Sequence, residues 1–237
     1  MAAKKKNNNE SCEFCGEEIH SKYLEEIGNN IGNGGTLGQR IMEFKYSPGK
    51  TAQDHPLSMP QRSKYSFAQA HHLISSEVLC TEEWSQICSI FGYDINCKEN
   101  GVFFPADMRV ACELKIPLHR GNHSQTQTEE TPDYVGVVTS LVMPVLEAAQ
   151  QGKYCDKKGA LIKKMNNISK EIWSYVKDFD WILTYDGSDY NSGGIGCLGV
   201  RSLPKKREIE DAGNVKKCPK GRNHGIGLRK STFFKEQ

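Results

Sequence analysis

The sequence predicts an α+β protein, because short extended segments precede two long stretches with helical periodicity. Residues 67–75, "FAQAHHLIS", and residues 99–105, "ENGVFFP", are typical of strands that lie next to a turn. Between residue 156 and about residue 177, apolar residues recur every three or four positions, which is typical of an amphipathic helix. Only 37% of the 237 residues are hydrophobic, so we expect a modest core and long solvated segments.

The first part of the chain gives few signals of regular structure. Residues 1–10 hold almost nothing to bury, and residues 12–20, "CEFCGEEIH", are predicted to form a compact polar knuckle. Glycines and prolines are frequent from Gly28 to Ser66, which predicts loops, with a short strand at residues 40–46, "RIMEFKY".

Helix start and stop signals recur in the middle of the chain. Residues 81–92 predict a helix with Thr81 at its N-cap and a glycine at its end. Pro117 predicts a short helix within residues 116–125, "IPLHRGNHSQ". A threonine and a proline predict the start of a further helix over residues 131–152.

Charge is distributed unevenly along the chain, although the net charge is only +2. From Pro204 to Gln237 there are ten lysines and arginines against four acidic residues. This basic C-terminal extension predicts either a solvated tail or an arm that contacts phosphates. No stretch approaches the roughly 20 apolar residues that a membrane-spanning helix needs, so we expect no membrane insertion. The basic start, "MAAKKKNNN", is followed by no apolar region, so we expect synthesis in the cytoplasm without a signal peptide.

Two of the nine cysteines, Cys12 and Cys15, have the C-x2-C spacing that presents two thiolates to one zinc ion. The others are scattered, and in a protein expected in the cytoplasm they favour reduced thiols over disulfides. The pair predicts either a structural zinc site or two free thiols. Candidates for the remaining zinc ligands are His20, His55, Cys218 and His224.

The histidines carry the most specific chemical signal. His119 and His123 are four residues apart, so on a helix they would lie one turn, about 5.4 Å, apart on one face and could bind one metal ion. A third histidine from a nearby strand would leave one position open, as in catalytic metal sites. His71 and His72 follow each other on a predicted strand, where successive side chains point to opposite faces. One of them can therefore bind the metal while the other takes a proton from water.

Four stretches together, "AHHLIS", "GYDIN", "ENGVFFP" and "LHRGNHSQ", resemble the AHH branch of the HNH nuclease superfamily. The resemblance covers about residues 67–178 and implies the ββα-metal fold shared with nuclease colicins, with a small catalytic core braced by helices. Members are often bacterial polymorphic toxins and secretion-system effectors. We therefore expect a loop-rich segment with the knuckle over residues 1–66, a nuclease domain over 67–178, and a strand, loop and basic tail over 179–237.

The resemblance implies a metal site with one histidine at the end of the first strand and two on the short helix. These ligands are His71, His119 and His123. His72 would be the general base that activates water. Asn100, in an Asn-Gly turn, would hold the backbone of the loop that carries the base. Arg120 is expected to contact the scissile phosphate because of its charge and its position between two ligands.

These features predict an endonuclease that hydrolyses DNA with one catalytic divalent ion, which would be Mg²⁺, Zn²⁺, Mn²⁺ or Ni²⁺. Basic residues would bind DNA through its phosphates, without reading its sequence. The resemblance also implies an antibacterial toxin or effector, with an immunity protein and a secretion machinery as partners. Two alternatives remain: a zinc-containing protein that binds nucleic acid without cleaving it, and a nuclease that acts on RNA.

Overall fold

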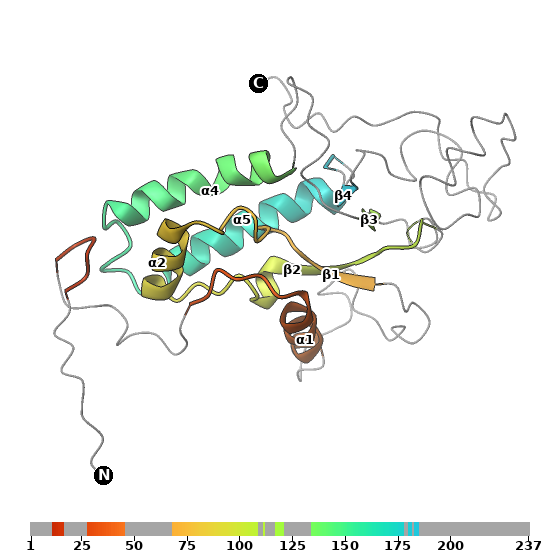
Figure 1. The fold of residues 1–237 in the computed structure, drawn as a ribbon, viewed down its shortest axis with the longest axis horizontal. Helices are drawn as coiled ribbons and strands as arrows, with labels where there is room; N and C mark the ends of the chain where they lie inside the picture. Colours follow the sequence, from red (N-terminus) through yellow and green to blue (C-terminus); the bar gives the residue numbers. More distant parts are fainter. Residues whose placement is uncertain are drawn as a thin grey trace, which may run out of the picture.

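The computed structural model places a small two-stranded sheet between helices (Figure 1). Strand β1 (Ala68–His72) pairs antiparallel with β2 (Gly101–Pro105), and the 3-10 turn η3 (Lys98–Asn100) leads directly into β2. Helix α1 (Gly34–Lys45) lies on one side of this pair and α5 (Ala160–Lys177) on the other (Figure 1). The predicted α+β class is confirmed. The structure describes residues 11–16, 28–45, 68–108, 111, 117–120, 134–177, 180–181 and 183–184.

Helix α1 (Gly34–Lys45) corrects the expectation of a strand that begins at residue 40. The Asn33 side chain accepts a hydrogen bond from the Thr36 backbone N–H at 2.9 Å, which satisfies one of the open donors at the start of the helix. Leu37 and Ile41 are fully buried in the core that includes β2. The free energy gained by burying this face outweighs the low helix propensity of the three glycines in α1. The local sequence pattern does not reveal this packing energy.

Helix α2 (Glu82–Phe91) forms where the sequence predicts it. The Thr81 hydroxyl accepts a hydrogen bond from the Trp84 backbone N–H at 3.4 Å. At the other end Gly92 adopts a φ of 74°, which a glycine tolerates at a helix C-cap. Both local signals were therefore read correctly.

Two long helices, α4 (Tyr134–Gln150) and α5 (Ala160–Lys177), confirm the helices predicted in the second half of the chain. The buried face of α5 follows the expected spacing up to Ile172. Tyr175, which the spacing also assigns to this face, is 38% exposed, and its ring stacks on Trp181 with centroids 5.0 Å apart. Val176 is buried in its place.

The structure also corrects the short helix expected within residues 116–125. His119 and Arg120 form strand β3 (His119–Arg120), which pairs in parallel with β4 (Leu183–Thr184). Pro117 favours a first helical turn only as a local signal. Pairing with a strand more than sixty residues later supplies the backbone hydrogen bonds instead, and sequence spacing does not reveal such a partner.

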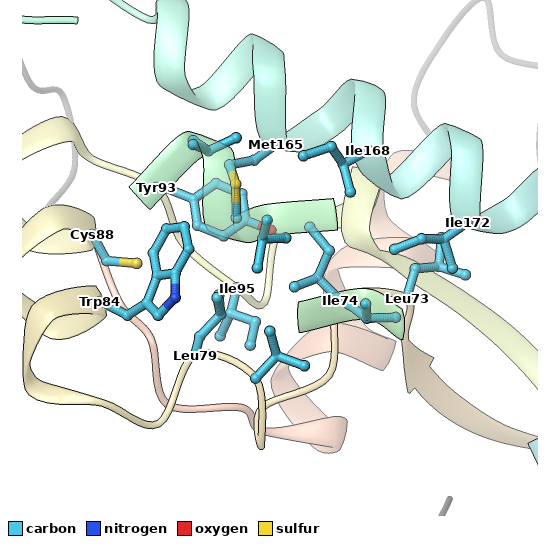
Figure 2. Packing of buried hydrophobic residues seen from close by; sticks show 14 of the residues in the cluster. Leu73, Ile74, Leu79, Trp84, Cys88, Tyr93, Ile95, Met165, Ile168 and Ile172 are labelled. Carbon is cyan, nitrogen blue, oxygen red and sulfur yellow. The ribbon is translucent and has the colours of Figure 1, made fainter. Parts of the chain in front are cut away.

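One buried cluster joins these elements (Figure 2). Met165, Ile168 and Ile172 project from α5 toward the segment that follows β1, where Leu73 and Ile74 are buried (Figure 2). Each such side chain contributes about 1.5–3 kcal/mol by leaving water. The sheet, and with it the two adjacent histidines, is therefore fixed against α5 by apolar packing.

Helices of the described part of the chain are too short or too polar to cross a membrane. Residues 28–45 share the buried cluster with the sheet through α1. The division into residues 1–66, 67–178 and 179–237 stays a prediction.

Candidate active site

His71 and His72 occupy the last two positions of β1, opposite Val102 and Gly101 of β2. His71 is buried, with 4% of its surface exposed, and it contacts side chains from α4, β2 and β3. His72 is half-buried and contacts Asn96. The alternation of side chains along a strand thus gives the two neighbours different surroundings.

A buried tyrosine fixes the proton of His71. The Tyr134 hydroxyl donates to the Leu73 carbonyl at 2.6 Å, so its oxygen accepts from Nε2–H of His71 at 3.2 Å. In the neutral ring the basic lone pair is then on Nδ1. Such an outer hydrogen bond sets the tautomer of histidines that bind metals.

His119 lies beside His71, with the two ring centroids 4.7 Å apart. Nδ1 of His119 is 3.0 Å from the side-chain oxygen of Gln69, which can only accept, so Nδ1 carries the proton and Nε2 is basic. With metal–nitrogen bonds of about 2.0–2.1 Å, two imidazoles on one ion have their centroids about 4.5–5.3 Å apart. The spacing of His71 and His119 fits two ligands of one cation.

A polar network holds His72. The Asn96 side-chain oxygen accepts from Nε2–H of His72 at 2.9 Å, which leaves the basic lone pair on Nδ1. Asn96 is in turn held through Asp94, which accepts from its backbone N–H at 2.9 Å and forms an ion pair with Arg40 at 2.5 Å. Burial lowers the pKa of His72 below its usual 6.5, against the raising effects of Asn96 and of the Glu77 and Asp94 charges. The ring is therefore neutral near pH 7 and able to accept a proton.

Asn100 is completely buried and joins three segments around the end of β1. Its side chain accepts from Ile74 N–H at 2.7 Å and donates to the carbonyls of Ile74 and Ile95 at 3.0 and 2.9 Å. Ser169 of α5 donates to the same amide oxygen at 2.9 Å, and Leu73 N–H donates to the Asn100 carbonyl at 2.8 Å. The residue therefore clamps the loop that directly follows the two histidines.

Other expected site residues are placed only in part. His119 is in a strand, so the one-turn relation expected between it and His123 on a helix does not apply. His123 lies outside the described residues. Arg120 pairs with Thr184 in the β3–β4 register.

Three positioning residues escaped the sequence analysis: Gln69, Asn96 and the hydroxyl of Tyr134. Gln69 had a weak signal, because it lies two positions before His71 and so on the same face of the strand. Asn96 closes the stretch "GYDIN", which carried part of the resemblance. The contact of the Tyr134 hydroxyl with His71 spans 63 residues, so no local pattern predicted it.

A second group of ligand atoms lies elsewhere in the molecule. Cys155 lies next to Cys12 and Cys15, and the three sulfur atoms are all within 4.8 Å of one another. No sequence spacing predicted Cys155, because it is 143 residues from Cys12. The expected candidates for further ligands lie outside the described residues: His20, His55, Cys218 and His224.

Tyr134 and the imidazoles of His71, His72 and His119 lie around one strand end, and the family comparison covers this part of the chain. Residues 57–172 match the model of a nuclease family of the HNH/Endo VII superfamily, described by its conserved AHH, which here is Ala70, His71 and His72. This match supports a nuclease, a hydrolase that acts on nucleic acid. Residues 57–172 of the chain are thus similar to the AHH nuclease family. No curated protein and no solved structure matched the chain significantly.

Proposed function

We propose that this protein is a divalent-metal-dependent endonuclease that hydrolyses DNA. The observation that carries the proposal is that His71 and His72 have different surroundings. The ring centroid of His71 is 4.7 Å from that of His119, whereas His72 contacts Asn96 and is neutral because burial lowers its pKa. The nuclease family makes phosphodiester hydrolysis the reaction that needs these two roles.

His72 takes the proton of the attacking water at Nδ1, while Asn96 holds the opposite nitrogen of the ring. His71, His119 and His123 are the proposed metal ligands. A divalent cation bound there would stabilise the negative charge that develops on the phosphate and the leaving oxygen. Asn100 keeps the loop in place, and Arg120 is the proposed contact to the scissile phosphate.

DNA is the proposed substrate on the strength of the family resemblance. The excess of lysine and arginine between Pro204 and Gln237 supports binding through phosphates, which carries no sequence preference. We further propose that the protein acts as an antibacterial toxin carried by a secretion machinery and neutralised by an immunity protein. Growth arrest of a bacterial host by the parent, but not by His72→Ala, tests the toxic activity.

The catalytic proposal is tested with supercoiled plasmid and a structured RNA, in a panel of Mg²⁺, Mn²⁺, Ni²⁺ and Zn²⁺ and with EDTA. We expect plasmid cleavage that EDTA abolishes, and a His72→Ala variant that is about 10²–10⁴-fold slower. Lys163→Ala, an exposed change on α5, is the control and should cleave at the parent rate. Cleavage by His72→Ala at the parent rate would show that the base is misassigned, and cleavage of RNA alone would exclude DNA as the substrate.

A further inference from the structure

A turn at residues 11–16 brings Cys12 and Cys15 against Cys155, which lies in the connection between α4 and α5. Sγ of Cys12 is 3.9 Å from Sγ of Cys155. A disulfide would need about 2.05 Å. Sulfur atoms bound to one tetrahedral zinc ion at about 2.3 Å lie about 3.8 Å apart, close to the observed distance.

The backbone is built to bring these segments together. Gly16 N–H donates to the Cys12 carbonyl at 2.7 Å and closes the turn, with Gly16 at a φ of 76° that a side chain would disfavour. On the facing segment, a Cβ on Gly152 would lie 3.0 Å from the Phe14 carbonyl oxygen and 3.6 Å from Cβ of Cys15. Glycines therefore permit both the sharp turn and the close approach.

Aromatic side chains anchor the turn outside the thiol cluster. Phe14 stacks on Phe91 of α2 with centroids 6.1 Å apart, and Phe91 meets the ring of Tyr154 at 6.3 Å. Cys12 is 1% exposed whereas Cys15 is exposed, so the cluster has one side open to an entering ion. The position of the turn is thus set by packing, and the three sulfur atoms meet at its surface.

We propose that Cys12, Cys15 and Cys155 bind a structural Zn²⁺ ion. Thiolates are soft ligands that favour zinc over Mg²⁺ or Ca²⁺. Within the described residues three ligand atoms converge, so water or a ligand from beyond them fills the fourth position. The ion fastens residues 11–16 to the α4–α5 connection, at the end of the molecule away from β1 and β3 (Figure 1). This second metal site is separate from the histidines and does not depend on the proposed catalytic function.

The test uses the full chain and Co²⁺ as a spectroscopic probe, since thiolate ligands give a charge-transfer band that histidine and oxygen ligands do not. We expect the parent to show this band with one equivalent of Co²⁺, and Zn²⁺ to abolish it. Cys155→Ser should lose most of the band, whereas Cys80→Ser, an exposed cysteine outside the cluster, should keep it. A folded parent without the band, or a Cys155→Ser variant that keeps all of it, would overturn the proposal.

A second measurement covers the case in which Cys155→Ser folds poorly. X-ray absorption at the zinc edge of the parent should show three sulfur atoms at about 2.3 Å. A strong chelator should lower the Tm of the parent, because zinc binding contributes to folding. A zinc shell of nitrogen and oxygen alone, or a Cys12–Cys155 disulfide in the isolated protein, would contradict the site.

Discussion

Asn100 shows how one buried amide can hold the loop that follows the two adjacent histidines. Four side-chain hydrogen bonds join the end of β1, the segment before η3, and α5. The asparagine-glycine turn made the residue visible in the sequence, but only the fold reveals Ser169 as its partner. The sequence therefore identified Asn100, whereas only the tertiary structure shows which groups its side chain binds.

Asn100→Ala should lower the free energy of unfolding by about 3 kcal/mol, because the buried groups of Ile74 and Ile95 lose their partners. Urea unfolding followed by circular dichroism measures the change. Asn167→Ala, an exposed position on α5, should change stability by less than about 0.5 kcal/mol. A loss below 1 kcal/mol for Asn100→Ala would show that the clamp is dispensable.

Tyr134→Phe should weaken binding of the catalytic ion about 10–100-fold, because the hydroxyl that orients His71 is lost while the ring remains. Mn²⁺ titrations of plasmid cleavage, together with calorimetry, give the apparent affinity. Tyr175→Phe, at a partly exposed ring on α5, should bind the ion like the parent. Equal affinities for the parent and Tyr134→Phe would mean that this hydrogen bond does not tune the site.

Elements with signals in their own residues were predicted, and elements that depend on distant partners were not. α2 carries both of its caps within a dozen residues, and it formed as expected. α1 was misread because its glycines suggest a loop, while Leu37 and Ile41 are stabilised by burial in the tertiary core. β3 was misread for the same reason, since β4 supplies its hydrogen bonds. The same rule holds for the two candidate sites. The stretch with His71 and His72 stood out in the local sequence, whereas Cys155 of the separate thiol cluster did not, because it is 143 residues from Cys12.

The segment at residues 28–30 offers a test of close packing between elements. Asn29 N–H donates to the Tyr93 carbonyl at 2.9 Å, and a Cβ on Gly28 would lie 1.7 Å from the backbone oxygen of Cys88 in α2. Gly28→Ala should therefore lower the free energy of unfolding by at least about 1–3 kcal/mol, because the backbone at Cys88 would have to move. Thermal unfolding measures the shift.

Gly34→Ala serves as the matched control, because a Cβ there would meet only the Ala70 carbonyl at an ordinary 3.8 Å. At this first position of α1, alanine should be neutral or stabilise by up to about 1 kcal/mol. If Gly28→Ala and Gly34→Ala unfold at the same temperature, residues 28–30 do not pack against α2 as described.

At the scale of the whole molecule, one core connects the sheet to α1, α2, α4 and α5. A single shared core predicts one cooperative unfolding transition for these elements. Tryptophan fluorescence probes different elements, because Trp84 lies on α2 and Trp173 on α5. Fluorescence and far-ultraviolet circular dichroism should therefore give the same midpoint.

Met165→Ala, a fully buried change on α5, should lower that common midpoint and the free energy of unfolding by about 2–5 kcal/mol. Lys163→Ala, two residues away and exposed, should leave both unchanged. Two separate transitions in the parent would show that the helices and the sheet do not unfold as one unit.

The parallel pairing of β3 with β4 has a consequence for synthesis on the ribosome. His119 of β3 is paired with Leu183 of β4. The strand β4 therefore leaves the ribosome long after His71 and His72 of β1. A nascent or truncated chain that ends before Leu183 lacks the backbone partner of His119, however well its helices have formed. If this pairing holds His119 beside His71, the two imidazoles of the proposed metal site would meet only late in translation, after residues 183 and 184 have emerged.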